Sequence, residues 1–231
     1  MRVGGLLKLS LIDYPQKLSC VIFTQGCPFR CHFCHNPSLV LPEKFTPVIE
    51  EEEIFNFLQK RVGQLDAVVI SGGEPTIQKD LITFAKKIRQ LGYFIKLDTS
   101  GIRPDVIQKL LDEKLVDYIA MDIKTSSLKY ESIINVNIDL NAIKTSIELI
   151  KNSSIDYEFR TTILPDHHQE EEVHQMGELI KGAKLHILQG FIPDFSLNPD
   201  FQSLEKCSEI KLKECQKIAE KYVDKCEIRI N

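Results

Sequence analysis

Three cysteines packed into a short stretch are the residues of this chain best suited to chemistry. Cys27, Cys31 and Cys34 stand in the stretch CPFRCHFCHN, residues 27–36, directly after an apolar run at 20–24. A loop can bend three thiolates at this spacing toward one point, where they can hold three irons of a cubane [4Fe–4S] cluster. Such a cluster ordinarily takes four thiolates. The spacing therefore predicts one iron that is open to bind and activate another ligand.

A zinc site is the alternative interpretation of the same stretch. His32 or His35 would then complete a closed tetrahedral site with the three cysteines. Zinc sites more often combine two separate Cys-x-x-Cys pairs, whereas this stretch holds a single Cys-x-x-x-Cys-x-x-Cys run. The spacing favours the cluster, and both interpretations stay open on these residues alone.

The composition is that of a globular enzyme. A chain of 231 residues is long enough for one large domain with a core. We expect a single domain over 1–231, with an N-terminal arm at 1–17 and a C-terminal extension at about 190–231. The contents of 43% apolar and 27% charged residues are ordinary. The net charge of −4 argues against nucleic acid as the main partner.

Cysteine usage bears on the compartment. Of the seven cysteines, three fall within eight residues, which indicates metal binding in a reducing cytoplasm rather than a disulfide framework. No apolar stretch approaches the roughly 20 residues of a membrane span. The first residues lack the apolar core of a secretory signal. We therefore expect a cytoplasmic protein without a membrane partner.

Apolar runs alternate with amphipathic segments along most of the chain. After a hairpin or arm at 3–14, strands are expected at 18–24, 67–71, 94–98, 117–123, 157–164, 185–188 and 226–230. Helices are expected at 50–62, 81–91, 105–114, 139–151, 170–181 and 204–222. This alternation predicts an α/β fold with a parallel sheet covered by helices. Because the units number fewer than the eight of a closed barrel, we predict a partial, open (β/α)6 TIM-type barrel, with a doubly wound sheet as the alternative.

Polar or glycine-rich groups follow the predicted strands, and parallel α/β folds build their sites at these carboxyl ends. The groups are Gln25-Gly26-Cys27, Ser71-Gly72-Gly73-Glu74-Pro75, Asp98-Thr99-Ser100-Gly101, Asp122-Ile123-Lys124, Arg160-Thr161-Thr162 and Gln189-Gly190. Each has a purely structural explanation, such as a turn at the glycines, a helix N-cap at Asp98 or Ser100, or a solvated Lys124. Their concentration at one edge, after a three-cysteine loop, favours a site.

The cysteine stretch, with Phe33 just before its third cysteine, resembles the cluster motif of radical S-adenosylmethionine (SAM) enzymes. Within that superfamily the chain is similar to the branch that activates glycyl radical enzymes. The segments at 9–15, 23–27 and 34–37 resemble the activating proteins of anaerobic ribonucleoside-triphosphate reductase. The resemblance covers residues 1 to about 125 and becomes vague beyond about 190.

The resemblance implies two cofactors. Cys27, Cys31 and Cys34 would be the catalytic and metal-binding residues that hold three irons of the [4Fe–4S] cluster, and SAM would chelate the fourth iron through its amino and carboxylate groups. Phe33 would lie near the adenine of SAM.

Further SAM contacts follow from the resemblance at the strand ends. Gly72, Gly73 and Glu74 would meet the methionine amino group, because glycines let backbone carbonyls approach and a carboxylate complements an ammonium. Asp98 and Ser100 are candidates for the ribose hydroxyls or a nearby cation.

A charged pair is expected at the next strand end. Lys124 would pair with the SAM carboxylate, and Asp122 would orient Lys124 or help to bind a monovalent cation.

The implied activity is reductive cleavage of SAM that ends in a glycyl radical on a partner enzyme, here an anaerobic ribonucleoside-triphosphate reductase. An external donor such as flavodoxin or ferredoxin would supply the electron. Two positions depart from related activators: Gln189 stands where formate-lyase activators carry a histidine, and Gln16 where a glycine is usual. The alternatives are a pyruvate formate-lyase-like partner, a small-molecule substrate, and a non-enzymatic zinc module.

Several other residues have expected structural roles. Cys20 alternates into an apolar strand and is expected in the core. The remaining cysteines, at 207, 215 and 226, are expected as core or helix-surface thiols. His167-His168 is expected in a solvated loop, and residues 191–195 as either a mobile flap over the site or a packed connection.

Overall fold

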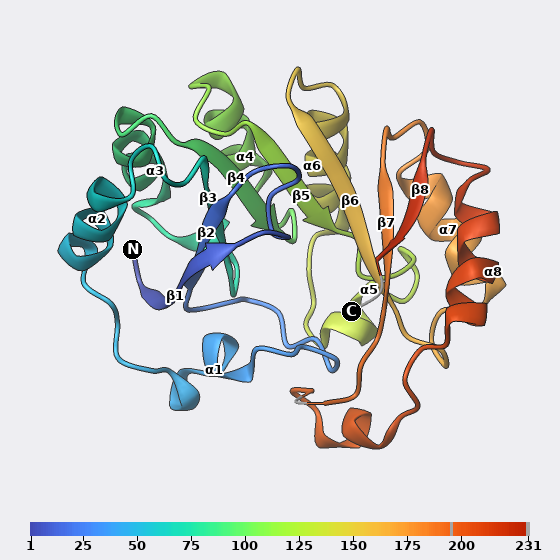
Figure 1. Cartoon of the computed structure of the whole chain (residues 1–231). Helices are drawn as coiled ribbons and strands as arrows, with labels where there is room; N and C mark the ends of the chain where they lie inside the picture. Colours follow the sequence, from blue (N-terminus) through green and yellow to red (C-terminus); the bar gives the residue numbers. More distant parts are fainter. Residues whose placement is uncertain (195, 230–231) are drawn as a thin grey trace. The chain divides into compact units, whose positions relative to one another are not determined.

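The protein is described by a computed structural model that covers residues 1–194 and 196–229 (Figure 1). Its residues divide into two compact units. The first unit comprises Met1–Pro28, Ser38–Ala120 and Ser153–Asp156; the second comprises Phe29–Pro37, Met121–Asn152 and the chain from Tyr157 onward. Because the chain passes between the units repeatedly, neither is a continuous stretch of sequence. The single domain expected over 1–231 stays a prediction.

The first unit is built on neighbouring strands in chain order. Its strands are β1 (Val3–Ser10), β2 (Ser19–Thr24), β3 (Ala67–Gly72) and β4 (Phe94–Thr99). β1 is a single strand that pairs antiparallel with β2, whereas a hairpin or arm was expected within residues 3–14. β2, β3 and β4 pair in parallel, with Cys20 opposite Val68 and Val68 opposite Ile95. All three side chains are fully buried, as expected of parallel strands with both faces covered.

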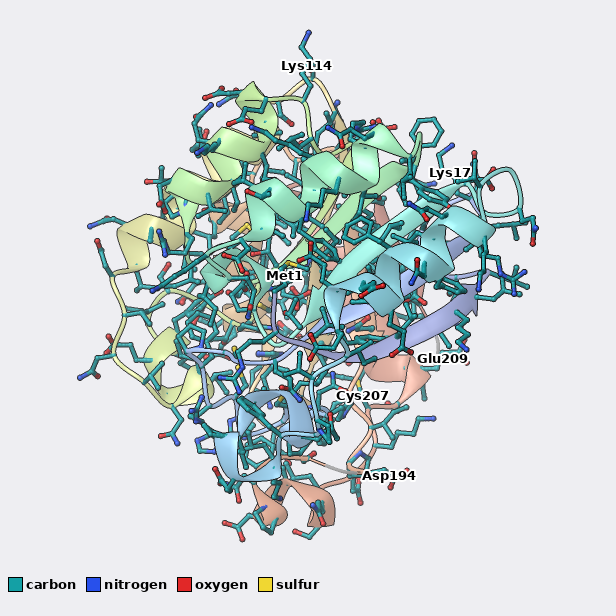
Figure 2. All side chains as sticks on the ribbon, turned by 90° about the vertical axis from the view of Figure 1, so that its left-hand side faces the viewer. Met1, Lys17, Lys114, Asp194, Cys207 and Glu209 are labelled. Carbon is teal, nitrogen blue, oxygen red and sulfur yellow. The ribbon has the colours of Figure 1, made fainter. Side chains whose placement is uncertain are left out.

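Amphipathic helices follow these strands. They are α2 (Glu51–Lys60), α3 (Leu81–Gln90) and α4 (Pro104–Asp112), with the short α1 (Pro37–Val40) and the 3-10 turns η1 (Pro42–Lys44) and η2 (Pro75–Ile77). α2 buries Ile54 and Leu58 and begins with three glutamates, where the helix dipole favours negative charge. Lys114 occupies the left-handed turn after α4, and its side chain projects outward (Figure 2).

The second unit continues the alternation. β5 (Tyr118–Asp122) is shared by the two units, and β6 (Asp156–Ile163), β7 (His186–Gly190) and β8 (Cys226–Arg229) follow. β6 pairs in parallel with β7, and β7 with β8. The helices are α5 (Tyr130–Ile134), α6 (Leu140–Lys151), α7 (Glu170–Leu179) and α8 (Glu209–Ala219), with the 3-10 turn η3 (Pro199–Ser203). The strand expected at 226–230 is found to Arg229, and residue 230 lies outside the described residues.

Three expectations for the second unit are wrong in detail. α8 begins at Glu209 rather than at 204, because the Ser208 side chain caps it by accepting a hydrogen bond from the Lys211 amide at 3.1 Å. α5 lay outside every expected helix. His168 is fully buried rather than solvated, and its Nδ1 accepts a hydrogen bond from the Leu164 amide. Within the described residues, no helix is both long and apolar enough to cross a membrane.

Candidate active site

The cysteine loop, defined as residues 29–37, belongs to the second unit and carries two of the three cysteines. Cys31 is buried, and the Cys34 amide donates a hydrogen bond to the Cys31 carbonyl at 3.1 Å, which turns the chain between them. Burial raises the pKa of the Cys31 thiol to about 12, while the nearby Lys124 ammonium acts in the opposite direction. Burial also raises the pKa of Cys34. Both thiols thus need a positive group or a metal to hold them as thiolates.

Cys27 belongs to the first unit, just beyond β2, and is half-buried. It follows Gly26, whose φ of 101° is open to glycine and strained for other residues. Each of the three cysteines of the stretch is a thiol rather than half of a disulfide. Among the residues that the structure describes, no group of three or more His, Cys, Asp or Glu side chains is gathered so that it could hold a metal ion. The Cys31 and Cys34 thiols of the cysteine loop, with the Lys124 ammonium near Cys31, are of the donor type that an iron–sulfur cluster takes.

The two histidines of the stretch are engaged elsewhere in the second unit. His32 Nδ1 lies 3.2 Å from the Asn198 amide nitrogen, and its ring stacks on Phe201. His35 Nε2 lies 2.7 Å from the Ile192 carbonyl oxygen, and its ring stacks on Phe191. Each imidazole has one nitrogen and one ring face occupied, which disfavours either as a fourth zinc ligand.

Phe33 is buried, and its ring centroid lies 5.8 Å from Lys124 Nζ. The structure therefore brings together two of the predicted SAM contacts and the loop that carries Cys31. An aromatic face beside an ammonium is favourable in itself. The contact of Phe33 with an adenine stays a prediction.

Asp122 and Lys124 form an ion pair where β5 ends, and a third charge completes it. Lys124 Nζ lies 2.8 Å from one oxygen of Asp122, and Arg160 Nε from β6 lies 2.9 Å from the other. Burial alone would raise the pKa of Asp122, but the charges of Arg160 and Lys124 outweigh it and hold that pKa well below its usual range. The pair raises the pKa of Lys124 despite its burial. Lys124 and Arg160 thus share one carboxylate, and an ammonium such as that of Lys124 is a suitable partner for a carboxylate ligand.

Sequence reasoning placed Arg160 among the strand-end groups without giving it a partner, and it passed over Tyr130. Arg160 was visible as a charged residue late in a predicted strand, which was a usable signal. Tyr130 is fully buried, and its hydroxyl oxygen lies 3.5 Å from the Lys124 amide nitrogen. Its position in a five-residue helix gave no periodic pattern to detect.

Two glycines in the first unit allow close backbone approach after β3. Gly72 has a φ of 112°, and a Cβ there would lie 2.3 Å from the Thr24 nitrogen. A Cβ on Gly73 would lie 2.2 Å from the Gly26 carbonyl oxygen. The Gly73 amide donates to Thr24 and the Glu74 amide to Gly26, each at 2.8 Å. Only glycine fits these positions, which tie the turn after β3 to the segment that precedes Cys27.

Glu74 differs from its expected orientation toward a ligand ammonium. Its side chain is fully buried, and one oxygen accepts hydrogen bonds from the Thr76 amide, the Thr76 hydroxyl and the Thr99 hydroxyl. The other oxygen accepts from the amide and hydroxyl of Ser100. The carboxylate thus joins the ends of β3 and β4. A direct contact with an ammonium stays a prediction, and the structure gives the carboxylate other partners.

Asp98 and Ser100 also have hydrogen-bond partners within the first unit. Ser100 is buried against Glu74, so its hydroxyl is already a donor. One oxygen of Asp98 lies 3.1 Å from the Ser71 hydroxyl, and the other lies 2.8 Å from Nζ of the buried Lys96. Lys96 is a lysine in an otherwise apolar strand, which sequence reasoning passed over. The roles of Asp98 and Ser100 toward a ribose or a cation stay predictions.

The fold and these side chains define an α/β enzyme with an iron–sulfur-type thiol loop and charged groups at its strand ends. The family model of the Radical SAM superfamily matches residues 21–180. A protein of Methanocaldococcus jannaschii named as a glycyl-radical enzyme activating enzyme is 39% identical over 232 residues, which cover 98% of this chain and 95% of that protein. The pyruvate formate-lyase-activating enzyme of Listeria monocytogenes is 33% identical over 134 residues, 53% of each chain.

Solved structures agree on the fold. A domain of the pyruvate-formate lyase-activating enzyme from Bacteroides vulgatus matches with a TM-score of 0.55 at 18% identity, covering 72% of this chain and 99% of that one. Streptococcus suis SuiB bound to S-adenosylmethionine matches with a TM-score of 0.65 at 14% identity, covering 91% of this chain and 49% of that one.

The chain belongs to the radical SAM superfamily, in its branch of glycyl-radical enzyme activating enzymes. The predicted class, an open α/β fold of parallel strands of the partial-barrel type, is confirmed. The family carries a [4Fe–4S] cluster and uses SAM.

Proposed function

We propose that this enzyme cleaves SAM reductively to place a glycyl radical on an anaerobic ribonucleoside-triphosphate reductase. The observation that carries the proposal is the Cys31 thiol beside Lys124, with Lys124 and Arg160 both paired to Asp122. The 39% identical relative supports a glycyl radical enzyme as the protein substrate. The choice of the reductase rests on the sequence segments at 9–15, 23–27 and 34–37.

In this proposal Cys27, Cys31 and Cys34 hold the cluster. When bound, the cluster and SAM together supply one-electron chemistry that the protein cannot perform alone. The chain's own part is to bind, orient and exclude water. Lys124 meets the SAM carboxylate as a cation whose charge is secured by its pairing with Asp122.

The backbone of Gly72 and Gly73 would meet the amino group of SAM, as the family resemblance implies. Glu74 fixes that backbone by its hydrogen bonds to the end of β4. Its carboxylate is also the proposed partner of the amino group. Asp98 and Ser100 are candidates for the ribose hydroxyls or a nearby cation, and Asp122 for a monovalent cation.

An external one-electron donor such as flavodoxin or ferredoxin would reduce the cluster, and cysteines that are thiols rather than disulfides support a reducing, cytoplasmic setting. A pyruvate formate-lyase-like partner is the second candidate, because the Listeria monocytogenes relative bears that name over half of this chain.

The test is anaerobic incubation of the cluster-loaded enzyme with SAM, a reductant and a candidate reductase. We expect a glycyl doublet in the electron paramagnetic resonance spectrum of the reductase, absent when its acceptor glycine is replaced by alanine. Cys31→Ala enzyme is the matched inactive control. A doublet on a pyruvate formate-lyase and none on the reductase would move the assignment to the second candidate. SAM cleavage with no doublet on either protein would favour a small-molecule substrate.

A further inference from the structure

Backbone hydrogen bonds tie the cysteine loop to α5. The Arg30 amide donates to the Ile134 carbonyl at 2.8 Å, and the His32 amide donates to the Ile133 carbonyl at 3.4 Å. These bonds tie two backbone donors of the loop to α5.

A segment far along the sequence bonds to the same loop. We call residues 196–203, which include η3, the strap. The Leu197 amide donates to the Cys34 carbonyl at 2.9 Å, and the Asn198 amide donates to the His32 carbonyl at 3.0 Å. The loop's acceptors at alternate residues are thereby used as well. Two of the three predicted cluster ligands thus lie in a loop that is hydrogen-bonded both to α5 and to the strap.

Side chains of the strap add to these backbone hydrogen bonds. The Phe201 ring is buried between two imidazoles, at 5.3 Å from His32 and 5.4 Å from His167, in both cases stacked. The Phe191 ring meets Phe201 edge-on at 6.3 Å. Offset stacks and edge contacts of this kind are favourable beyond their buried area.

Asn198 joins the strap to the loop through both ends of its amide. Its Oδ1 accepts a hydrogen bond from the Asp200 amide at 3.0 Å, which caps η3. Its Nδ2 lies 3.2 Å from His32 Nδ1. At the base, the Cys207 amide donates to the Phe191 carbonyl at 3.0 Å and closes the segment that holds the strap. Asp194 and Cys207, labelled in Figure 2, stand before and after the strap in the chain.

From these contacts we propose that Asn198 and Phe201 are positioning residues for the thiols of Cys31 and Cys34. They hold the cysteine loop in its closed form, so that the two thiols stay oriented and shielded from water. The alternatives of a mobile flap and a packed connection concerned residues 191–195, where the buried Phe191, whose carbonyl accepts the Cys207 amide, favours a packed connection. Residue 195 of that segment lies outside the described residues. This inference rests on the proposed function only in the cluster-release experiment, whereas the thiol-labelling experiment is independent of it.

The first experiment uses metal-free, full-length protein under anaerobic conditions. Thiols are labelled with a maleimide, and the rate at each cysteine is read by peptide mass spectrometry. Asn198→Ser keeps a capping oxygen for η3 but is too short to reach His32. Loss of one hydrogen bond should speed labelling of Cys31 and Cys34 about tenfold. Phe201→Ala should speed it about a hundredfold or more, and Phe201→Leu should recover part of the protection.

Internal controls separate local opening from general loosening. Cys215 and Cys226 are buried in the same unit and should label at the wild-type rate in both variants. Gln202→Ala alters an exposed strap residue that bonds Ser196 rather than the loop, and should leave Cys31 and Cys34 protected. Unchanged rates at Cys31 and Cys34, or an equal increase at Cys215 and Cys226, would overturn the proposal.

The second experiment measures cluster release after reconstitution, as the loss of visible absorbance in the presence of an iron chelator and without SAM. Both variants should lose the cluster faster than wild type and faster than Gln202→Ala. Release at the wild-type rate contradicts the positioning role. If wild-type protein holds no cluster, the proposed function fails, while thiol labelling still decides the role of the strap.

Discussion

Replacement of Lys124 by alanine is the most direct test of the charged group at the end of β5. Lys124 Nζ is 2.8 Å from Asp122, and Arg160 remains 2.9 Å from the same carboxylate after the change. Asp122 therefore keeps a cationic partner, and the fold should persist. The cluster should also persist, because Lys124 is not a predicted iron ligand.

The expected loss falls on SAM binding. A hydrogen bond to a charged group is worth about 2 kcal/mol when its partner is left unpaired, which corresponds to roughly thirtyfold weaker binding. Salt should reduce the difference only slightly, because the Lys124 side chain is 17% exposed and partly buried pairs are weakly screened.

The assay is equilibrium binding of SAM to cluster-loaded protein by anaerobic calorimetry. Lys129→Ala is the matched control: it removes a lysine of the same segment whose ammonium pairs with Glu172 at the surface, and should bind SAM like wild type. Affinity of Lys124→Ala within twofold of wild type would remove Lys124 from the site. Loss of the cluster in this variant would also refute the reasoning, since it would place Lys124 in the support of Cys31.

Three further predictions concern other parts of the molecule. Cys31→Ala should lose both cluster absorbance and SAM cleavage, measured by iron and sulfide analysis and by methionine release; turnover with a full iron content would contradict the ligand assignment. Glu74→Gln should destabilise the protein by about 2–4 kcal/mol, because an amide group replaces an acceptor that faces buried donors; an unchanged urea midpoint would disprove the network. Burial lowers the pKa of His186 to about 4. The neutral imidazole therefore contributes about 3 kcal/mol to the free energy of unfolding above its unfolded pKa near 6.5, and this contribution is lost as the pH falls toward 4. In His186→Gln, the free energy of unfolding measured by urea titration should depend less on pH between about 4 and 6.5. An unaltered pH dependence would contradict the lowered pKa of His186.

The parallel strands were predictable because burial on both faces demands continuous apolar runs, as at Val68, Val69 and Ile70. The cysteine loop was predictable because spacing alone constrains what three thiols can bind. Shorter elements were not. α5 has five residues, too few for a helical period, and α8 begins late because a serine cap outweighs the apolar pattern before it.

Side-chain direction was the part of the candidate site that sequence could not supply. The sequence pattern predicts that Glu74 lies at a strand end. The hydrogen-bond donors to its carboxylate include Thr99 and Ser100, about 25 positions away in the chain. In the same way, the second partner of Asp122 is Arg160, 38 residues further along. Such pairings depend on the registers of neighbouring elements, which a local pattern does not encode.

The long sequence separation between the strap and the cysteine loop has a consequence for biogenesis. His32 and Asn198 are 166 residues apart, so during synthesis the ribosome must complete most of the polypeptide before these two residues can meet. Until then the nascent loop lacks half of its hydrogen-bonding partners, and its thiols stay open to oxidants and to stray metals. Iron insertion is therefore expected to succeed best on the finished polypeptide, after translation.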